Sequence, residues 1–171
     1  MSARPQTKLA MRPLLPADVP LLAELFRASI EEAGAEDYSE AQLEAWASAA
    51  DDEEEFGARL ARELTLVATL EGAPIGFAAL ADNSCIDMLY VHPAATGQGV
   101  GAMLCDALEK LAAARGVTEL SVDASDTARG FFEQRGYTAK TRNTVTLGDE
   151  WLANTTMVRA LAAAASKGSV S

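Results

Sequence analysis

Histidine, cysteine and long apolar runs are all scarce in this chain of 171 residues. One histidine and two cysteines without a C-x-x-C spacing offer no cluster of metal ligands, so we expect neither a metal centre nor a disulfide. No apolar run approaches the ~20 residues of a membrane-spanning helix, and the first twelve residues lack the apolar segment of a signal peptide. These absences predict a cytoplasmic protein that does not enter a membrane.

Basic residues are also few: 14 Lys and Arg stand against 25 Asp and Glu, for a formal net charge of −11. A field of this sign repels nucleic acid and anionic lipid, so we expect neither as a partner, whereas a cationic amine would be tolerated or attracted. The length and the 49% hydrophobic content fit one domain with a single core, which we place at residues 1–161. Residues 162–171 are small and polar, and we interpret them as a flexible tail.

The first part of the chain predicts a short strand followed by helices. Residues 8–12 form the candidate strand, and Asp18 stands where it would cap a helix that ends at Gly34. Ser39 and Gln42 have the spacing of a capping box, which predicts that a second helix begins there.

Strands are predicted after an acidic run at residues 51–55, which itself has the composition of a solvated first helical turn. Three short apolar stretches follow, and turn-forming residues separate them. They predict an antiparallel meander of strands at residues 64–70, 75–81 and 85–91.

The clearest helix covers residues 100–115, where apolar side chains recur at i, i+3 and i+4 and Gly116 supplies a stop. A strand at residues 119–123 follows this helix and should therefore lie parallel to the strand at residues 85–91. The last predicted elements are a short helix at residues 128–135, capped by Asp126, and two strands at residues 137–147 and 154–161.

The most informative segment joins the strand at residues 85–91 to the clearest helix. The run Thr96-Gly97-Gln98-Gly99-Val100-Gly101 places three alternating glycines at the start of that helix. The first amides of a helix have no intrahelical partner, and glycines let a phosphate approach the backbone closely. This arrangement predicts a cradle for a diphosphate at residues 97–102.

Two phosphate-binding motifs compete for this segment. A P-loop is excluded because Gly101 is followed by Ala102-Met103 rather than by Lys and Ser or Thr. The dinucleotide fingerprint Gly-x-Gly-x-x-Ala fits residues 97–102, and Asp123 stands where a ribose-binding carboxylate is expected. The long approach from Val91 and the short chain after Asp123 count against it, but a dinucleotide-dependent oxidoreductase stays open as an alternative.

A second motif lies further along the chain, at residues 125–137, and reads Ser-x-x-Ala-x-x-Phe-Phe-x-x-x-Gly-Tyr. With this motif, the glycine-rich run and the order of elements, the chain resembles the GNAT superfamily of N-acetyltransferases. The family signatures are Gln/Arg-x-x-Gly-x-Gly/Ala and Asn-x-x-Ala-x-x-Leu/Phe-Tyr-x-x-x-Gly-Phe; Thr96, Ser125 and Phe132 depart from them. The resemblance implies an α/β (α+β) fold, with a central mixed, mostly antiparallel twisted sheet of about seven strands flanked by helices.

The resemblance also implies an enzyme that moves an acetyl group from acetyl-CoA to a primary amine of a small molecule or peptide by direct attack. In this family the strand before the glycines binds the pantetheine arm through its backbone, and one amide there polarises the thioester. The cofactor-binding residues expected by position are Leu89, Tyr90, Val91, Thr96, Gly97, Gln98, Gly99, Val100, Gly101, Ala102, Ser125 and Phe132.

The catalytic residues follow less directly, because the tyrosine that usually serves as the acid in this family is Phe132 here. Tyr90 and Tyr137 are candidate replacements, with Tyr137 better explained as a sheet anchor, and a thiol pKa near 8.5 also allows protonation by water. Asp87 lies in an apolar strand, where desolvation would raise its pKa; it is either the general base or amine ligand, or a solvated edge residue. His92 precedes a proline in a turn, so we expect it at the surface.

The acceptor side is expected between the N-terminal helices and the last hairpin. Candidate residues for a cleft, or for a contact between two copies of a monomer or homodimer, are Tyr38, Trp46, Arg142 and Trp151. The exchanges in the two signatures also leave open a non-catalytic sensor that binds acyl-CoA.

Overall fold

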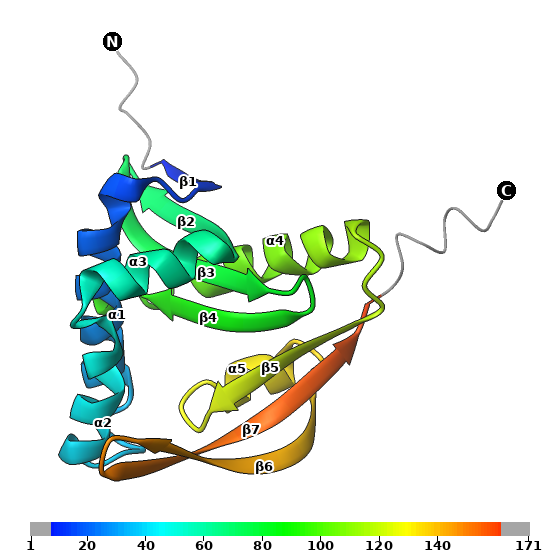
Figure 1. Ribbon diagram of the computed structural model, residues 1–171. Helices are drawn as coiled ribbons and strands as arrows, with labels where there is room; N and C mark the ends of the chain where they lie inside the picture. Colours follow the sequence, from blue (N-terminus) through cyan, green and yellow to red (C-terminus); the bar gives the residue numbers. More distant parts are fainter. Residues whose placement is uncertain (1–7, 162–171) are drawn as a thin grey trace, which may run out of the picture.

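The computed structural model describes residues 8–161, which form one seven-stranded sheet flanked by helices (Figure 1). The strands are β1 (Leu9–Pro13), β2 (Leu64–Leu70), β3 (Ala73–Ala81), β4 (Cys85–Val91), β5 (Glu119–Ser125), β6 (Thr138–Leu147) and β7 (Glu150–Ala160). The helices are α1 (Val19–Ala33), α2 (Glu40–Ala47), α3 (Glu53–Arg62), α4 (Val100–Ala114) and α5 (Arg129–Gln134), with 3-10 turns η1 (Pro16–Asp18), η2 (Ser48–Ala50) and η3 (Pro93–Ala95). The predicted tail at residues 162–171 lies outside the described residues.

The strand order is β1-β2-β3-β4-β5-β7-β6, and every neighbouring pair is antiparallel except β4 and β5. This arrangement confirms the predicted mixed, mostly antiparallel sheet, including the meander and the single parallel pair. A doubly wound dinucleotide-binding sheet would be mostly parallel. The topology therefore counts against the dinucleotide-binding alternative.

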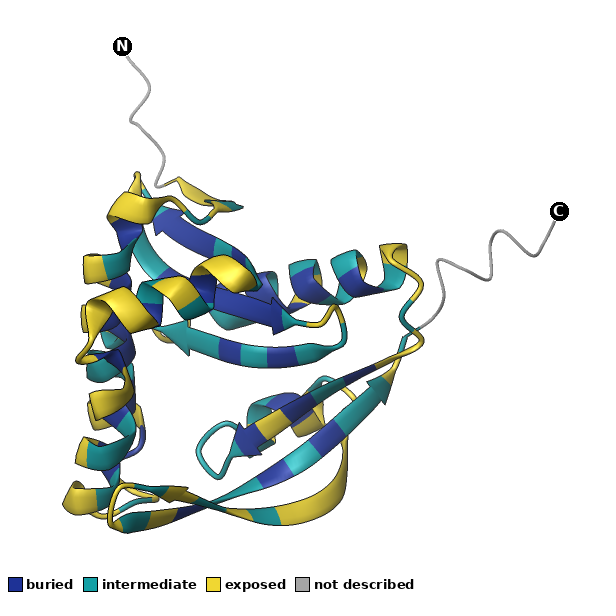
Figure 2. Cartoon of the chain, viewed as in Figure 1, coloured by how far each residue is buried: buried dark blue, intermediate teal, exposed yellow. Residues whose placement is uncertain are grey.

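Alternate residues of the central strands face two different helical layers. On β3, Ala78 and Leu80 belong to the core under α4, whereas Phe77 and Ala79 belong to the core under α1 and α3. Figure 1 shows α4 on one side of the sheet and α1 and α3 on the other, and Figure 2 shows the buried positions along these strands. The sheet thus separates α4 from the N-terminal helices.

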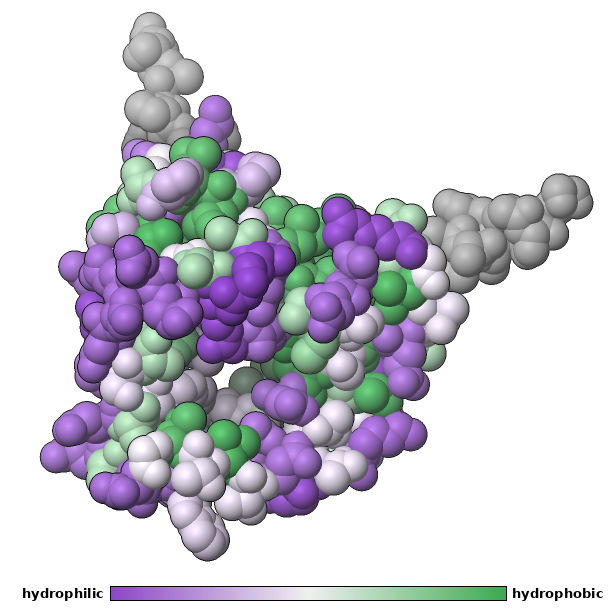
Figure 3. Space-filling view, viewed as in Figure 1, coloured by the Kyte–Doolittle hydropathy of each residue, from purple (hydrophilic) through white to green (hydrophobic). Residues whose placement is uncertain are grey.

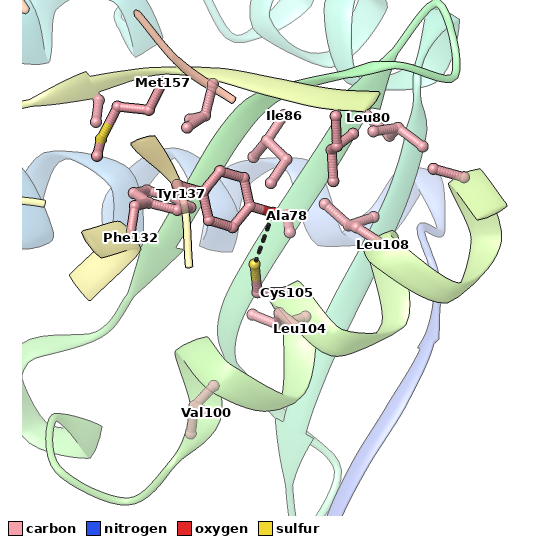
Figure 4. Packing of buried hydrophobic residues seen from close by; sticks show 14 of the residues in the cluster. Ala78, Leu80, Ile86, Val100, Leu104, Cys105, Leu108, Phe132, Tyr137 and Met157 are labelled. Carbon is pink, nitrogen blue, oxygen red and sulfur yellow. Dashed lines mark hydrogen bonds between the residues drawn. The ribbon is translucent and has the colours of Figure 1, made fainter. Parts of the chain in front are cut away.

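The core under α4 depends on the helical spacing that the sequence predicted. Val100, Leu104 and Leu108 of α4 belong with Ile86 to the core between this helix and the sheet (Figure 4). Full burial of such a side chain contributes about 1.5–3 kcal/mol. This packing fixes the position of the first turn of α4.

The start of α2 confirms a prediction, and the start of α1 corrects one. The Ser39 hydroxyl accepts a hydrogen bond from Gln42 N–H at 3.1 Å, and Gln42 Oε1 accepts one from Ser39 N–H at 2.9 Å, which forms the capping box. Asp18 precedes α1, but its side chain does not cap that helix. It accepts hydrogen bonds from Arg12 at 2.7 and 2.8 Å and from Leu15 N–H at 2.8 Å, and these bonds lower the pKa of Asp18.

A second capping prediction, at Asp126, was wrong. The Ser125 hydroxyl makes the local bond, accepting from Ala128 N–H at 3.1 Å just before α5. Asp126 instead accepts two hydrogen bonds from Arg142, at 2.6 and 3.0 Å, which lower its pKa. A bidentate hydrogen bond to a guanidinium is stronger than a bond to a neutral amide, so the Asp126 carboxylate binds Arg142 and does not cap α5.

The second strand of the last hairpin begins earlier than predicted, at Glu150 rather than at residue 154. Gly148 has a φ of 59°, a left-handed conformation that suits a two-residue turn. Leu147 therefore pairs at once with Glu150. Trp151 and Leu152 then alternate as strand residues, one 67% and the other 7% exposed.

Three features are absent from residues 8–161. No helix there combines the length and the apolar character needed to cross a bilayer. No three His, Cys, Asp or Glu residues gather into a cluster suited to a metal ion. Cys85 and Cys105 are not bonded to each other; the first is half-buried and the second buried.

Candidate active site

Strands β4 and β5 separate after only two residue pairs. Cys85 lies opposite Ser121 and Ile86 opposite Val122, and the pairing ends there. Beyond these pairs, β4 is bonded to β3 on one side, and no strand within residues 8–161 pairs with its other side. An unpaired strand edge presents free N–H and C=O groups, so residues 87–91 offer their backbone to a ligand.

A bulge in β4 sets the direction of the side chains along this open stretch. The register with β3 skips one residue, which leaves Asp87 as the extra residue between Ile86 and Met88. Met88 belongs to the core under α1 and α3, and Asp87 is bonded to Arg59 of α3, so both side chains face that layer. Leu89 packs on the opposite face, against the core under α4.

A cleft of about 330 Å³ lies where the two strands diverge, and it is seen as the hollow at the centre of Figure 3. Its aromatic lining consists of Phe26, Tyr38, Trp46, Tyr90 and Phe132. Its polar lining includes Arg59, Asp87, Asp123, Ser125 and Asn154. Because Phe26 and Phe132 belong to the cores on opposite faces of the sheet, the cleft reaches both helical layers.

The glycine-rich segment forms an open N-terminus on α4. Gly97 and Gly99 have φ values of 86° and 79°, and a β-carbon at either position would meet no atom within 4 Å. No side chain caps the helix at Gly99, and the first helical bond runs from Met103 N–H to Gly99 C=O, at 3.0 Å. The amides of residues 100–102 precede that bond and have no intrahelical acceptor.

Gly101 connects this helix start to the cleft. A β-carbon at Gly101 would lie 3.6 Å from Phe131 Cε1 and 3.8 Å from Val91 Cγ2. The Phe131 ring in turn packs edge-on against Phe132, with 5.1 Å between the ring centroids, and Phe132 lines the cleft. A ligand that spans the helix start and the cleft would therefore cross continuous, packed surface.

The Asp87 carboxylate is ion-paired at the wall of the cleft. Arg59 donates to Asp87 Oδ2 from Nε at 3.0 Å and from Nη2 at 2.7 Å. Glu63 lies beside this pair, and its pKa is raised to about 7 by burial and then by the hydrogen bond and charge of Asp87. The charges of Arg59 and Arg62 act in the opposite direction.

Two tyrosines reach the cleft in different settings. The Tyr38 hydroxyl accepts from Asp126 N–H at 2.8 Å and donates to Ala153 C=O at 3.3 Å, which ties the chain before α2 to β7 and to the turn after β5. Tyr90 lies edge-on against Phe26, with ring centroids 4.7 Å apart. Burial raises the pKa of Tyr90 to about 12.

This geometry coincides with a family match. The model of the acetyltransferase (GNAT) domain matches residues 34–160, a stretch that contains the open end of α4 and every lining residue of the cleft except Phe26. The chain belongs to the GNAT acetyltransferase family. Family membership, together with the mostly antiparallel sheet, excludes the dinucleotide-binding alternative.

Several individual GNAT proteins are similar to this chain in sequence or in structure. YafP of Escherichia coli (strain K12), an uncharacterized N-acetyltransferase, is 32% identical over 146 residues, which are 85% of this chain and 92% of YafP. A GCN5-related N-acetyltransferase from Rhodopseudomonas palustris, whose name also includes "Aminotransferase, Class-II", is 58% identical with a TM-score of 0.89, over 94% of this chain and 100% of that one. The PaiA N-acetyltransferase of Thermoplasma acidophilum, crystallised with coenzyme A, is 22% identical with a TM-score of 0.74, over 90% and 99% of the two chains. At that identity the PaiA likeness shows the fold.

The GNAT fold places the predicted site residues in two adjoining groups. Asp87, Leu89, Tyr90, Ser125 and Phe132 line the cleft. Residues 96–102 form the turn before α4 and the first residues of that helix, and Val91 lies between the groups, beside Gly101. The structure thus brings these residues into one continuous region, and their roles in binding and catalysis stay predictions.

Phe132, Tyr137 and His92 lie in the surroundings that their sequence context suggested. Phe132, at the position of the family tyrosine, is 2% exposed and packs edge-on against Tyr137. Tyr137 is also buried, and its hydroxyl donates to Glu109 at 2.7 Å and lies near the Cys105 thiol (Figure 4), so it anchors the core away from the cleft. His92 is exposed, and its Nδ1 accepts from a backbone amide in its own turn.

Of the four residues proposed for the acceptor side, two line the cleft and two do not. Tyr38 and Trp46 line the cleft and face each other edge-on, with ring centroids 5.5 Å apart. Arg142 is bound to Asp126, and the exposed Trp151 is not among the described residues that line the cleft. Tyr38 and Trp46 therefore contribute to the aromatic wall from the segment before α2 and from α2, and the tip of the hairpin does not.

Arg59 and Glu63 are the site residues that sequence reasoning missed. Both belong to the region of α3, far along the chain from Asp87. A signal was present: each stands three residues after a buried residue of α3, Phe56 or Leu60, and so lies beside the buried face. A charged residue at such a position is well placed to meet a partner on the sheet.

Proposed function

We propose that this protein transfers the acetyl group of acetyl-CoA to a primary amine of a small molecule or peptide, by direct attack of the amine on the thioester. The observation that carries the proposal is the open edge of β4 beside the unpaired amides of α4. A ligand that fits both needs an extended amide-containing arm and an anionic diphosphate, as acetyl-CoA has. Acetyl-CoA would supply the acetyl group and a thiolate leaving group.

Residues 97–102 would hold the diphosphate chiefly through backbone N–H groups. Thr96 is short and exposed, so it cannot reach as far as the Gln or Arg that is usual at this position. A helix N-terminus stabilises a nearby negative charge by about 0.3–1 kcal/mol, and direct N–H hydrogen bonds add to this. The pantetheine arm would lie along the open edge of β4, with Ser125 and Phe132 on the facing wall.

The same strand would polarise the thioester carbonyl. Leu89, Tyr90 and Val91 lie on the unpaired edge, so an N–H among them is free to donate to the carbonyl oxygen as negative charge develops there. One fixed donor of this kind lowers a barrier by about 3–4 kcal/mol in other acyl-transfer sites. Because the bulge at Asp87 turns the strand at this point, it also determines where the free N–H groups point.

The lining of the cleft favours a cationic amine with a small apolar body. Arg59 is the one basic residue among the described residues of the lining, and its guanidinium is already ion-paired with Asp87. Asp87 and Asp123 leave the cleft negative, while Tyr38, Trp46 and other aromatic side chains form an apolar wall. Carboxylates attract an ammonium group, and aromatic faces bind both cations and apolar chains.

Proton transfer in this mechanism begins at Asp87. The carboxylate faces the cleft from the bulge and would take a proton from the bound ammonium group, which frees the nitrogen lone pair for attack. The leaving thiolate, with a thiol pKa near 8.5, is protonated by water. The pKa of about 12 makes Tyr90 a weaker acid than that thiol, which disfavours Tyr90 as the proton donor.

The test is release of free thiol from acetyl-CoA with 2-phenylethylamine, a primary amine with a small aromatic body. We expect turnover by the wild-type protein and a loss of about tenfold or more in kcat for Asp87→Asn, with unchanged affinity for CoA. Asp149→Asn, the same exchange on an exposed turn, should have no effect. Equal rates for Asp87→Asn and the wild type would exclude Asp87 as the base.

A non-catalytic acyl-CoA sensor is the second candidate, and the exchanges Thr96 and Phe132 favour it. A sensor would bind CoA in calorimetry yet release no thiol with 2-phenylethylamine or with a panel of other primary amines. Phe132→Tyr and Thr96→Gln would then change affinity for CoA without creating turnover.

A further inference from the structure

Glu63 has a buried carboxylate oxygen, Oε1, with no hydrogen-bond partner among the described residues. Buried polar atoms in folded proteins are nearly always paired, so such an oxygen requires an explanation. Glu63 stands between α3 and β2 and lines a second cavity of about 580 Å³, whereas Asp87 lines the cleft. The hydrogen bond and the charge of Asp87 nevertheless both act on the carboxyl group of Glu63.

The titratable and charged groups around Glu63 come from two elements. Arg59 and Arg62 belong to α3, and Asp87 and Cys85 belong to β4. Arg59 directs Nε and Nη2 at Asp87, and Arg62 acts on Glu63 only through its charge. Neither arginine therefore donates a hydrogen bond to the buried oxygen, and the hydrogen-bonding group that acts on Glu63 is the carboxylate of Asp87.

We propose that Glu63 and Asp87 share one proton, and that this carboxyl pair, rather than Asp87 alone, receives the proton of the acceptor amine. The proposal rests on the acetyltransferase function proposed above. A proton held between the two groups supplies the donor that the buried Glu63 Oε1 lacks. Arg59 holds the Asp87 carboxylate by two hydrogen bonds at the wall of the cleft, so Glu63 acts through Asp87 as a positioning residue.

The proton balance of the step is simple. The step starts from the pair without its proton, the form that accumulates above pH 7. An N–H bond of the bound ammonium group breaks, its proton passes to Asp87 and becomes the one proton shared with Glu63, and the electron pair stays on nitrogen. That pair forms the new C–N bond to the thioester carbonyl carbon, and the C–S bond breaks with its electrons leaving on sulfur. The new amide nitrogen loses its second proton to water, and the thiolate takes a proton from water. The shared proton then returns to solvent, which restores the pair for the next turnover.

The pKa of Glu63 supports this reading of the geometry. Burial raises it to about 7, and both the hydrogen bond and the charge of Asp87 add to the rise. Two carboxylates in one site cannot both ionise easily, and the proton that they share belongs to the pair. A proton acceptor with a pKa close to the working pH is the most effective general base.

Kinetics test the pair through its pH dependence. With 2-phenylethylamine as acceptor, we expect kcat/KM of the wild type to rise with an acid limb near pH 7. In Glu63→Gln this limb should move to lower pH and the plateau should fall about tenfold or more, because a weaker base remains. Glu55→Gln, on the exposed side of α3, should keep the wild-type profile. A limb that stays in place in Glu63→Gln overturns the proposal.

A titration without substrate separates this proposal from the proposed function. In protein labelled with ¹³C at glutamate carboxyl groups, the Glu63 signal of the wild type should titrate near pH 7, and Asp87→Asn should shift that midpoint to lower pH. A Glu63 midpoint in the ordinary glutamate range would overturn the shared proton even if thiol release is normal. A midpoint near 7 without any thiol release would instead count against the acetyltransferase function alone.

Discussion

Gly76 of β3 lies directly against Val100, the first residue of α4. A β-carbon on Gly76 would lie 3.0 Å from Val100 Cγ1 and 3.2 Å from the carbonyl oxygen of Tyr90. Gly76 also pairs with Val91 in the ladder between β3 and β4. The missing side chain therefore lets the open end of α4 approach the sheet beside the unpaired edge of β4.

Gly76→Ala should disturb both stability and cofactor binding. The added methyl group overpacks the contact with Val100, which typically costs about 1–3 kcal/mol in the free energy of unfolding. Displacement of the first turn of α4 should also weaken the affinity for CoA, measured by calorimetry. Gly130→Ala is the matched control, because Gly130 lies in α5 and an added β-carbon meets nothing within 4 Å. Equal effects of the two substitutions would contradict the contact as described.

The aromatic wall and the negative cleft predict a preference between two related amines. L-Phenylalanine adds a carboxylate to 2-phenylethylamine, and its repulsion by Asp87 should lower kcat/KM by about tenfold or more, equivalent to ~1.4 kcal/mol. Trp46→Ala should raise the KM for 2-phenylethylamine and leave the KM for acetyl-CoA near the wild-type value. Trp151→Ala, which removes an exposed tryptophan outside the cleft lining, is the control. Comparable kcat/KM values for the two amines would exclude a cleft selective for cations.

The raised pKa of Glu63 predicts how stability depends on pH. Its folded-state pKa of about 7 lies above the ordinary glutamate value near 4.3, so between these pH values the folded chain holds a proton that the unfolded chain has lost. This contribution to stability is present below about pH 4 and is lost as the pH rises through 7. Glu63→Gln should therefore gain stability relative to the wild type between pH 5 and pH 8.5, by about 1–2 kcal/mol or roughly 3–6 °C in Tm.

Within residues 8–161, other carboxyl groups with shifted pKa values do not titrate between pH 5 and pH 8.5. The pKa values of Asp18 and Asp126 are lowered by their arginine partners, so their contributions are lost only at lower pH. Thermal unfolding of both proteins at several pH values is the measurement. A Tm difference that stays constant from pH 5 to pH 8.5 would mean that Glu63 does not titrate in this range.

Local sequence signals were sufficient to predict the order of elements and the glycine-rich helix start. The apolar spacing of residues 100–115, the turn sequences of the meander and the Ser39 capping box each depend on near neighbours in the chain. The parallel pairing of β4 with β5 followed from the helix between them. The family resemblance then predicted which of these elements surround the site.

Long-range pairings could not be predicted in the same way. Asp18 and Asp126 stood where helix caps are expected, but Arg12 and Arg142 bind them through stronger charge-assisted hydrogen bonds. Asp87 meets Arg59 across 28 positions of sequence. That contact depends on the bulge in β4, which no local pattern reveals.

The claim on which the account depends is that the free amides at the start of α4 bind a diphosphate. Titration of ¹⁵N-labelled protein with CoA, followed by amide NMR, tests it most directly, with inorganic pyrophosphate as a second ligand. We predict that the amide signals of residues 97–102 shift most with CoA and move in the same direction with pyrophosphate. Saturation with CoA while these signals stay in place, or no shift anywhere at millimolar CoA, would contradict the account.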